Sequence, residues 1–305
     1  MKTLGRKTQL QSAMEYLMTY GWAILIIAVV LGALFQLGIF NASTFTPKAP
    51  PGSCHVFRPN GPGTSSFINT QGICNGELPQ YVASFNGKGY VSITKSAPLN
   101  TLGNAGAITV SMWIYSSSRN SNGCNGIFGD WTDPSNGLQI LSGNANGNCA
   151  GPLYFGNPGA AAPWPSGKTY LTQGSWEMVT AEYDSTSGVA NLYLNNVLYA
   201  STTSSGKSLY NPSTPYYIGA HAWSLASELF YGYISNVQMY NKSFSQNDIT
   251  ALYNEGIGGA PIALSNLVGW WPLNGDAKDY SGNNGNGVTT AVTFTSNWEQ
   301  GYSAP

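Results

Sequence analysis

The sequence predicts an all-β sandwich preceded by one N-terminal transmembrane α-helix. The helix is predicted because no charged residue interrupts the chain between Glu15 and Lys48. The sandwich is predicted because short apolar or alternating runs, separated by Gly, Asn and Ser, begin at Gln80. Charged residues make up 8% of the 305 residues, aromatic residues make up 13%, and the net charge is −1. This composition supplies an ample core and implies neither nucleic acid nor an anionic surface as a partner.

The apolar run over residues 17–40 is predicted to span a membrane. At about 1.5 Å per residue it forms a helix of roughly 36 Å, which crosses a hydrocarbon core of about 30 Å with some tilt. Three basic residues, Lys2, Arg6 and Lys7, precede the run, and only Lys48 follows soon after it. This asymmetry predicts a single-pass protein of the cell membrane with a cytoplasmic N-terminus and an extracellular C-terminal domain.

The residues directly before this run form a pattern of their own. The sequence Gln11-Ser-Ala-Met-Glu15 leads straight into the apolar segment, and this pattern resembles the class III signal peptide of archaeal type IV pilin-like proteins. The resemblance implies that a prepilin peptidase cuts between Leu10 and Gln11, leaving residues 1–10 as a cytoplasmic leader and 11–40 as the pilin-like helix. Glu15 is then expected to pair with the N-terminal ammonium of a neighbouring subunit. The alternative is an interfacial glutamate that only reaches towards water.

Residues 41–79 are predicted to form a stalk rich in Pro, Gly and Ser, together with a loop closed by cysteines. The four cysteines of the chain, Cys54, Cys74, Cys124 and Cys149, all lie on the outer side. An even number in an extracellular setting favours disulfides, and no CxxC pair indicates a zinc site. The expected pairing is local, the first with the second and the third with the fourth. Free buried cysteines are the alternative.

Residues 80–305 are predicted to form one large β domain. In the run Ile108–Tyr115, alternate residues would face opposite sides of a strand. Asn195-Asn196 separates two short β runs and predicts a two-residue hairpin, because asparagine tolerates positive φ. One short helix is predicted at Gln246–Asn254, with Ser245 as its cap. Further strands are expected at residues 90–94, 126–130, 138–142, 176–183, 216–219 and 232–240.

Six segments occur in a characteristic order along this domain. They are residues 85–93, 108–115, 176–184, 191–200, 231–240 and 245–253. Their order resembles the laminin-G-like (LamG) domain of the concanavalin A-like superfamily, which implies a jelly-roll sandwich. The pattern LVGWWPL, which usually begins such a domain, stands here at residues 267–273. Residues 266–305 are therefore expected to supply a permuted strand to the same jelly roll.

Three tryptophans are candidate ligand-binding residues. Trp131, Trp164 and Trp223 fall in loop-like segments, where flat aromatic rings could stack on sugar faces. The alternative is that these rings cover the core or contact neighbouring subunits.

A loop rich in Asn and Gly near the C-terminus is a candidate calcium site. The resemblance implies that Ca²⁺ is sometimes bound near this loop, and Asp279, Asn283 and Asn286 offer the oxygen atoms that this hard cation prefers. Plain turns are the alternative, since Asx and Gly runs favour turns. No other cofactor is expected.

Glycoside hydrolysis is the competing class of function. Glu182 and Asp184 have the even spacing that would place two carboxylates on one strand face, but their strand resembles a structural one, and Glu177 would face the opposite way. Neither His55 nor His221 stands in a convincing triad setting. We therefore predict that the protein is not an enzyme.

The sequence as a whole predicts a membrane-anchored, pilin-like cell-surface protein that displays a LamG-like domain for adhesion or for recognition of carbohydrate or protein. The expected partners are the membrane, prepilin peptidase, like subunits, and glycans or surface proteins. The alternatives are a purely structural subunit of a surface appendage and a concanavalin A-like glycoside hydrolase.

Overall fold

The computed structural model describes residues 20–32, 78–119, 123–132, 137–143, 152–156, 165–203 and 214–305, together with the backbone of 54–57 and 69–72. The chain divides into two compact units, Met1–Pro47 and Lys48–Pro305.

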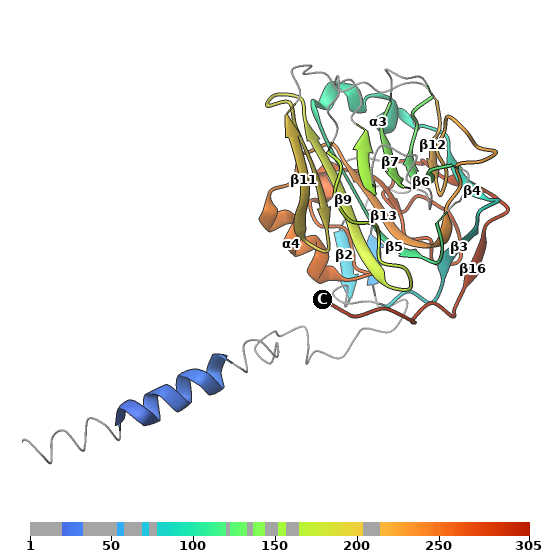
Figure 1. Cartoon of the computed structure of the whole chain (residues 1–305). Coiled ribbons are helices and arrows are strands. Elements are labelled where there is room, and N and C mark those ends of the chain that lie inside the picture. Colours follow the sequence, from blue (N-terminus) through green and yellow to red (C-terminus); the bar gives the residue numbers. More distant parts are fainter. Residues whose placement is uncertain are drawn as a thin grey trace, which may run out of the picture. The chain divides into compact units, whose positions relative to one another are not determined.

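In the first unit, residues 20–32 form a helix (Figure 1). Its large apolar side chains are exposed; Trp22 and Ile24, for example, are each 64% exposed. Within the described ranges, no helix is long and apolar enough to cross a membrane. The rest of the predicted span, the leader with the cut between Leu10 and Gln11, and Glu15 lie outside the described residues.

The second unit contains two antiparallel sheets that face each other (Figure 1), so the predicted all-β sandwich is confirmed. The eight-stranded sheet has the order β11-β10-β9-β5-β13-β3-β16, and β14 also pairs with β13. Its strands are β3 (Val82–Asn86), β5 (Ala107–Ser116), β9 (Trp176–Asp184), β10 (Val189–Leu194), β11 (Val197–Thr203), β13 (Tyr231–Tyr240), β14 (Leu267–Trp271) and β16 (Thr293–Thr295). The six-stranded sheet has the order β15-β4-β12-β6-β7-β8. Its strands are β4 (Tyr90–Ile93), β6 (Asn125–Gly129), β7 (Gln139–Ser142), β8 (Leu153–Gly156), β12 (Tyr216–Ile218) and β15 (Gly287–Thr290).

Local signals fix the turns and the helices of the sandwich. The predicted hairpin between β10 and β11 is confirmed, because Asn195 and Asn196 have φ of 48° and 70° between paired strands. The predicted helix is α4 (Gln246–Glu255), which begins with a capping box between Ser245 and Asp248. The other short helices are α3 (Ala97–Asn100), η1 (Leu102–Ala105) and η2 (Leu264–Asn266).

The main core lies between the two sheets and follows the predicted alternation of β5. Ile108, Val110, Met112 and Ile114 all belong to it and are at most 1% exposed. Tyr183 of β9 belongs to the same core, because alternate residues of β9 face it as well. The inner face of the eight-stranded sheet is therefore apolar along its central strands.

The outer face of the eight-stranded sheet is buried along its central strands as well. Trp113 of β5 stacks on Tyr253 of α4, with ring centroids 5.6 Å apart, and meets the edge of Tyr302 at 5.7 Å. Trp298 lies beside Trp176 of β9 at 6.1 Å. Helix α4 and the C-terminal segment thus form a second apolar layer on this sheet, which explains why both alternating faces of β5 are buried.

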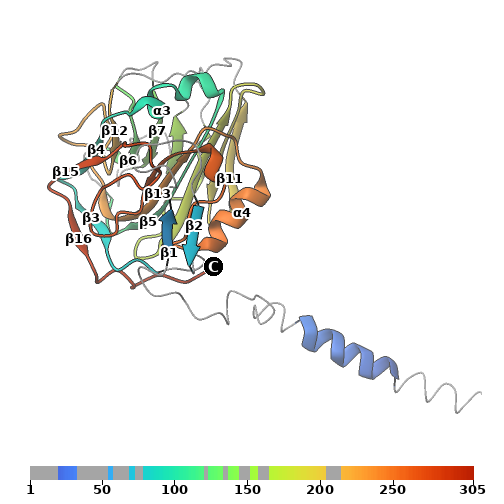
Figure 2. The same ribbon diagram turned by 180° about the vertical axis from the view of Figure 1, so that it is seen from behind.

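Residues 266–305 contribute strands to both sheets (Figure 2). Strand β14 pairs with β13, β15 pairs with β4, and β16 pairs with β3. Strands β3 and β14 lie end to end along one side of β13, since β3 pairs with its residues 231–234 and β14 with its residues 237–240. Between these two stretches Asn236 has φ of 52° at a register shift. The C-terminal segment is thus an integral part of the sandwich.

The segment predicted as a stalk contains paired backbone. Strands β1 (Cys54–Phe57) and β2 (Asn69–Gly72) form a two-stranded antiparallel sheet, with Cys54 opposite Gly72. Cys124 is disulfide-bonded. The side chains of Cys54, Cys74 and Cys149 lie outside the described residues, so the pairing stays a prediction.

Candidate ligand-binding site

Two loops that start from neighbouring strands bring two of the predicted tryptophans together. Trp131 follows β6 in the connection to β7, and Trp223 lies in the connection from β12 to β13. Their ring centroids are 5.9 Å apart and their planes are inclined by 38°. Trp223 is 56% exposed, whereas Trp131 is half-buried. Trp164 lies outside the described residues.

The Trp223 loop is closed at its base by a histidine and a glutamate. The His221 N–H donates to the Glu228 carbonyl at 2.9 Å, and the Nδ1 of His221 pairs with a carboxylate oxygen of Glu228. Inside the loop, the N–H groups of Ser224 and Glu228 donate to the carbonyls of His221 and Ser224, each at 3.0 Å. These bonds hold Trp223 on a short, closed turn.

His221 also connects this loop to the other one. Its ring is parallel to that of Trp131, with an interplanar angle of 5° and a centroid distance of 5.2 Å. The residue is 5% exposed, and its buried Nε2 has no hydrogen-bond partner among the described residues. The backbone of His221 can approach β6 closely because Gly126 has no side chain. A Cβ at Gly126 would lie 1.9 Å from the backbone nitrogen of His221. No motif in the sequence marks His221 as a stacking residue or Glu228 as its partner.

The Trp131 loop is closed at its base by Asp130. The Asp130 N–H donates to the Leu138 carbonyl at 2.9 Å, and Oδ1 accepts the Leu138 N–H at 2.7 Å. The other carboxylate oxygen is 2.5 Å from Lys95 Nζ. Burial raises the pKa of Asp130 to about 6, although Lys95 and the Leu138 N–H act to lower it. Burial likewise lowers the pKa of Lys95, while Asp130 acts to raise it.

This arrangement offers one exposed aromatic face on a rigid support. Trp223 is largely exposed to solvent and packs against Trp131, which in turn stacks on His221. The Glu228 side chain is 20% exposed and carries acceptor oxygens next to the rings. A flat apolar surface with a few polar atoms beside it can stack on one face of a sugar ring and accept hydrogen bonds from its hydroxyl groups.

The predicted calcium loop is held by hydrogen bonds to its own backbone. Asp279 Oδ1 accepts the N–H groups of Trp270 and Ser281, at 3.0 and 2.8 Å, and Oδ2 accepts the N–H of Gly285 at 2.9 Å. Three of the acceptor positions of this carboxylate are therefore used by backbone donors.

The two asparagines of this loop join the same network. Asn286 Oδ1 accepts the Asp279 N–H at 3.0 Å, and Asn283 Nδ2 donates to two carbonyls of β14, at 3.1 and 3.2 Å. The structure thus brings Asp279 and Asn286 into contact, whereas the Asn283 side chain is bonded to β14. Among the described residues, no group of three or more His, Cys, Asp or Glu side chains is placed to hold a metal ion. Calcium binding stays a prediction.

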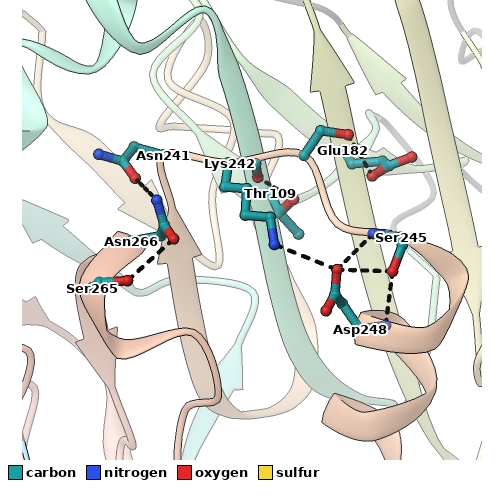
Figure 3. A network of polar contacts seen from close by, with 9 residues as sticks. Thr109, Glu182, Asn241, Lys242, Ser245, Asp248, Ser265 and Asn266 are labelled. Carbon is teal, nitrogen blue, oxygen red and sulfur yellow. Dashed lines mark hydrogen bonds and ion pairs between the residues drawn. The ribbon is translucent and has the colours of Figure 1, made fainter.

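The carboxylates considered for hydrolysis occupy structural positions. Glu182 is 5% exposed, and its carboxylate accepts hydrogen bonds from Asn191 Nδ2 at 2.5 Å and Ser243 Oγ at 2.9 Å. The connection from β13 to α4 crosses the sheet at this point (Figure 3), where Thr109 Oγ1 donates to the Lys242 carbonyl at 2.6 Å. Burial raises the pKa of Glu182, despite these hydrogen bonds.

The other two carboxylates each accept hydrogen bonds from groups nearby in the chain. Asp184, at the end of β9, accepts the Thr186 N–H at 2.8 Å and closes a turn. Glu177 accepts the N–H and the hydroxyl of Thr172, at 2.8 and 3.1 Å. Glu177 stands at an odd-numbered position of β9, on the face that points to the main core. Glu182 stands at an even-numbered position, on the same face as Trp176.

Comparisons with known proteins agree with this fold. Residues 85–250 match the family model described as the concanavalin A-like lectin/glucanases superfamily. No curated protein sequence matches the chain. A solved structure from Bacteroides ovatus, named for a suspected role in carbohydrate binding, is similar with a TM-score of 0.55 and 19% identity. The similarity covers 75% of this chain and 66% of that one, so the chain spans slightly less than two thirds of its length.

Two further solved structures show a weaker likeness. A heptameric SAP-like pentraxin from Limulus polyphemus has a TM-score of 0.42 and 17% identity, over 56% of this chain and 81% of that one. Domains LG4-5 of the mouse laminin α1 chain have a TM-score of 0.41 and 16% identity, over 61% of this chain and 47% of that one.

Proposed function

Since the chain belongs to the concanavalin A-like lectin/glucanases superfamily, we propose that it recognises carbohydrate through the pair of Trp131 and Trp223. One observation carries this proposal: Trp223 is 56% exposed, yet its ring lies 5.9 Å from that of Trp131. A large aromatic side chain that is left exposed on a closed loop indicates a contact surface. The name of the Bacteroides ovatus protein points to the same class of ligand.

The positions of the candidate carboxylates argue against hydrolysis. Retaining glycosidases need two carboxyl groups about 5 to 5.5 Å apart on either side of the sugar bond. The carboxylate of Glu182 is instead buried and bonded to Asn191 and Ser243, and that of Asp184 closes a turn. We therefore propose a recognition protein without hydrolase activity.

We extend the proposal to a role at the cell surface. The chain would be anchored in the membrane through residues 17–40, processed after Leu10, and used for adhesion. Support comes from the uncharged apolar run, from the exposed apolar side chains of the helix at 20–32, and from the leader pattern Gln11-Ser-Ala-Met-Glu15. A calcium ion held by Asp279, Asn283 and Asn286 remains part of this proposal, as does assembly with like subunits.

The glycan-binding proposal is tested with Trp223→Ala in the full chain, solubilised in detergent and applied to a glycan array. We expect the unaltered chain to bind one class of glycan. The variant should lose at least about tenfold in affinity, which corresponds to about 1.4 kcal/mol. Its melting temperature should stay the same, because the ring is mostly exposed.

The matched control is Val288→Ala, which truncates another exposed apolar side chain, 66% exposed on β15. This variant should bind as the unaltered chain does. An array on which the unaltered chain binds nothing would refute carbohydrate recognition and leave the structural appendage role.

The assembly proposal is tested with Glu15→Gln. If the Glu15 carboxylate pairs with the N-terminal ammonium of a neighbouring subunit, the variant should remain in the membrane but form no filaments, because insertion depends only on the apolar run. Filaments are counted by electron microscopy and membrane insertion by cell fractionation. Filaments of normal number and length in the variant would contradict the pairing, and an N-terminal sequence that begins at Met1 would remove its premise.

A further inference from the structure

The loop that carries Trp131 is held by three hydrogen bonds of Asp130, the residue just before the tryptophan. Besides its two hydrogen bonds with Leu138, Asp130 accepts the hydroxyl of Thr214 at its carbonyl, at 2.9 Å. The opposite end of the loop is equally close: Gly137 has φ of 104°, and a Cβ there would lie 2.7 Å from the Trp131 Cα. The position of the Trp131 backbone therefore depends directly on Asp130.

Lys95 holds the remaining oxygen of Asp130 from the other side. The Lys95 and Asp130 side chains are each 1% exposed, and Nζ is 2.5 Å from Oδ2. The ammonium also lies 4.2 Å from the ring centroid of Tyr216 in β12. Lys95 itself is anchored by the Asn100 side chain, whose Nδ2 donates to the Lys95 carbonyl at 3.1 Å. The ion pair thus ties the segment after β4 and the strand β12 to the start of the Trp131 loop.

Stability alone does not explain a charged pair at this depth. Moving two charges out of water costs as much as their attraction returns, and apolar residues of similar volume often replace such pairs without loss. Burial raises the pKa of Asp130 and lowers that of Lys95, so the surroundings disfavour both charged forms. The directional contacts of the pair are what an apolar pair could not supply.

We infer that the ion pair of Lys95 and Asp130 is a positioning element of the tryptophan site, which holds Trp131 in the place where His221 and Trp223 pack against it. Neither charged group needs to touch the ligand. Their effect on binding passes through the orientation of Trp131 and, through its ring contacts, of Trp223. The effect on affinity rests on the proposed function, whereas the effect on ring positions does not.

The test is the neutral double variant Lys95→Met/Asp130→Asn in the full chain. The asparagine keeps an acceptor for the Leu138 N–H, and the methionine keeps most of the lysine volume. The chain is labelled with 5-fluorotryptophan, and the ¹⁹F signals of Trp131 and Trp223 are assigned with Trp→Phe variants. We expect both signals to shift and broaden. Affinity for the array glycan that the unaltered chain binds most strongly should fall about tenfold, while the melting temperature changes by only a few degrees.

The matched control removes a more exposed ion pair, which lies in the C-terminal segment. Lys278→Met/Asp276→Asn neutralises a pair 3.5 Å apart whose side chains are 72% and 33% exposed, and it should leave both signals and the affinity unchanged. If the Lys95/Asp130 variant kept both ¹⁹F signals and full affinity, the inference would be overturned. A blank array would refute the proposed function but not this inference, which the ¹⁹F signals then decide. If the melting temperature of the variant falls by more than a few degrees, amide hydrogen exchange separates local from global effects. Faster exchange confined to the Trp131 loop supports the positioning role, and uniformly faster exchange overturns it.

Discussion

Deleting residues 266–305 should abolish cooperative folding of the sandwich. The deletion removes β14, β15 and β16, and with them Trp271, Trp270 and Trp298, which are 0%, 6% and 2% exposed. Removing a buried tryptophan side chain costs about 3 to 5 kcal/mol, so the three together approach or exceed the roughly 5 to 15 kcal/mol of a whole domain. Circular dichroism should show no cooperative melting transition for the truncated chain. A melt at the temperature of the full chain would show that the sandwich is complete without this segment.

A shorter deletion and a rearranged chain control this experiment. Removing only residues 303–305 leaves Tyr302 in place and should shift the melting temperature by no more than a few degrees. Trp298 Nε1 donates to the Pro79 carbonyl at 3.1 Å, so the C-terminal segment lies beside the start of the domain. Placing residues 266–305 before Leu78 through a short Gly/Ser linker should therefore restore the cooperative transition. Failure of this permuted chain to fold would argue against the predicted permutation.

The turns and the central strands could be predicted because their signals are local. The positive φ values of Asn195 and Asn196 follow from residue type, and the apolar face of β5 follows from its alternation. The burial of Trp113 on the opposite face could not be predicted, because the residues that cover it, Tyr253 and Tyr302, are more than a hundred positions away along the chain. Alternation gives the two faces of a strand but not what covers each of them.

The candidate site could be predicted only in part for a related reason. Trp131 and Trp223 are predictable as candidates because both stand in loop-like segments, and the strand order then places their ring centroids 5.9 Å apart. The role of His221 depends on the closed turn to Glu228 and on the absence of a side chain at Gly126. None of these contacts leaves a periodic pattern in the sequence, because each joins residues through tertiary packing. The same holds for Lys95 and Asp130.

The single variant Lys95→Met should destabilise the chain little in acid and increasingly as pH rises above about 6. Without Lys95, the carboxylate of Asp130 stays buried without a counter-ion, and breaking a buried pair in this way costs about 3 to 5 kcal/mol. Burial already raises the pKa of Asp130 from 3.8 to about 6, and removing the nearby ammonium raises it further. A group whose pKa is raised in the folded state contributes stability that is fully present below its unfolded value and is lost as pH rises through its folded value. The loss relative to the unaltered chain should therefore be small near pH 4, where Asp130 is largely protonated in both proteins, and should grow by up to about 1.4 kcal/mol per pH unit as pH rises above about 6.

The difference in free energy of unfolding between Lys95→Met and the unaltered chain reports on Asp130 and not on the other buried acids. Burial also raises the pKa values of Glu177, Glu182 and Glu255, but they titrate in both proteins, and their effect cancels in the difference. The measurement is urea unfolding at several pH values between 4 and 8, followed by circular dichroism. The double variant Lys95→Met/Asp130→Asn has no titrating group at this place, so its difference from the unaltered chain should lack the steep loss near neutral pH. If Lys95→Met lost the same free energy at pH 4 as at pH 8, then Lys95 would act through its packing and not through its charge.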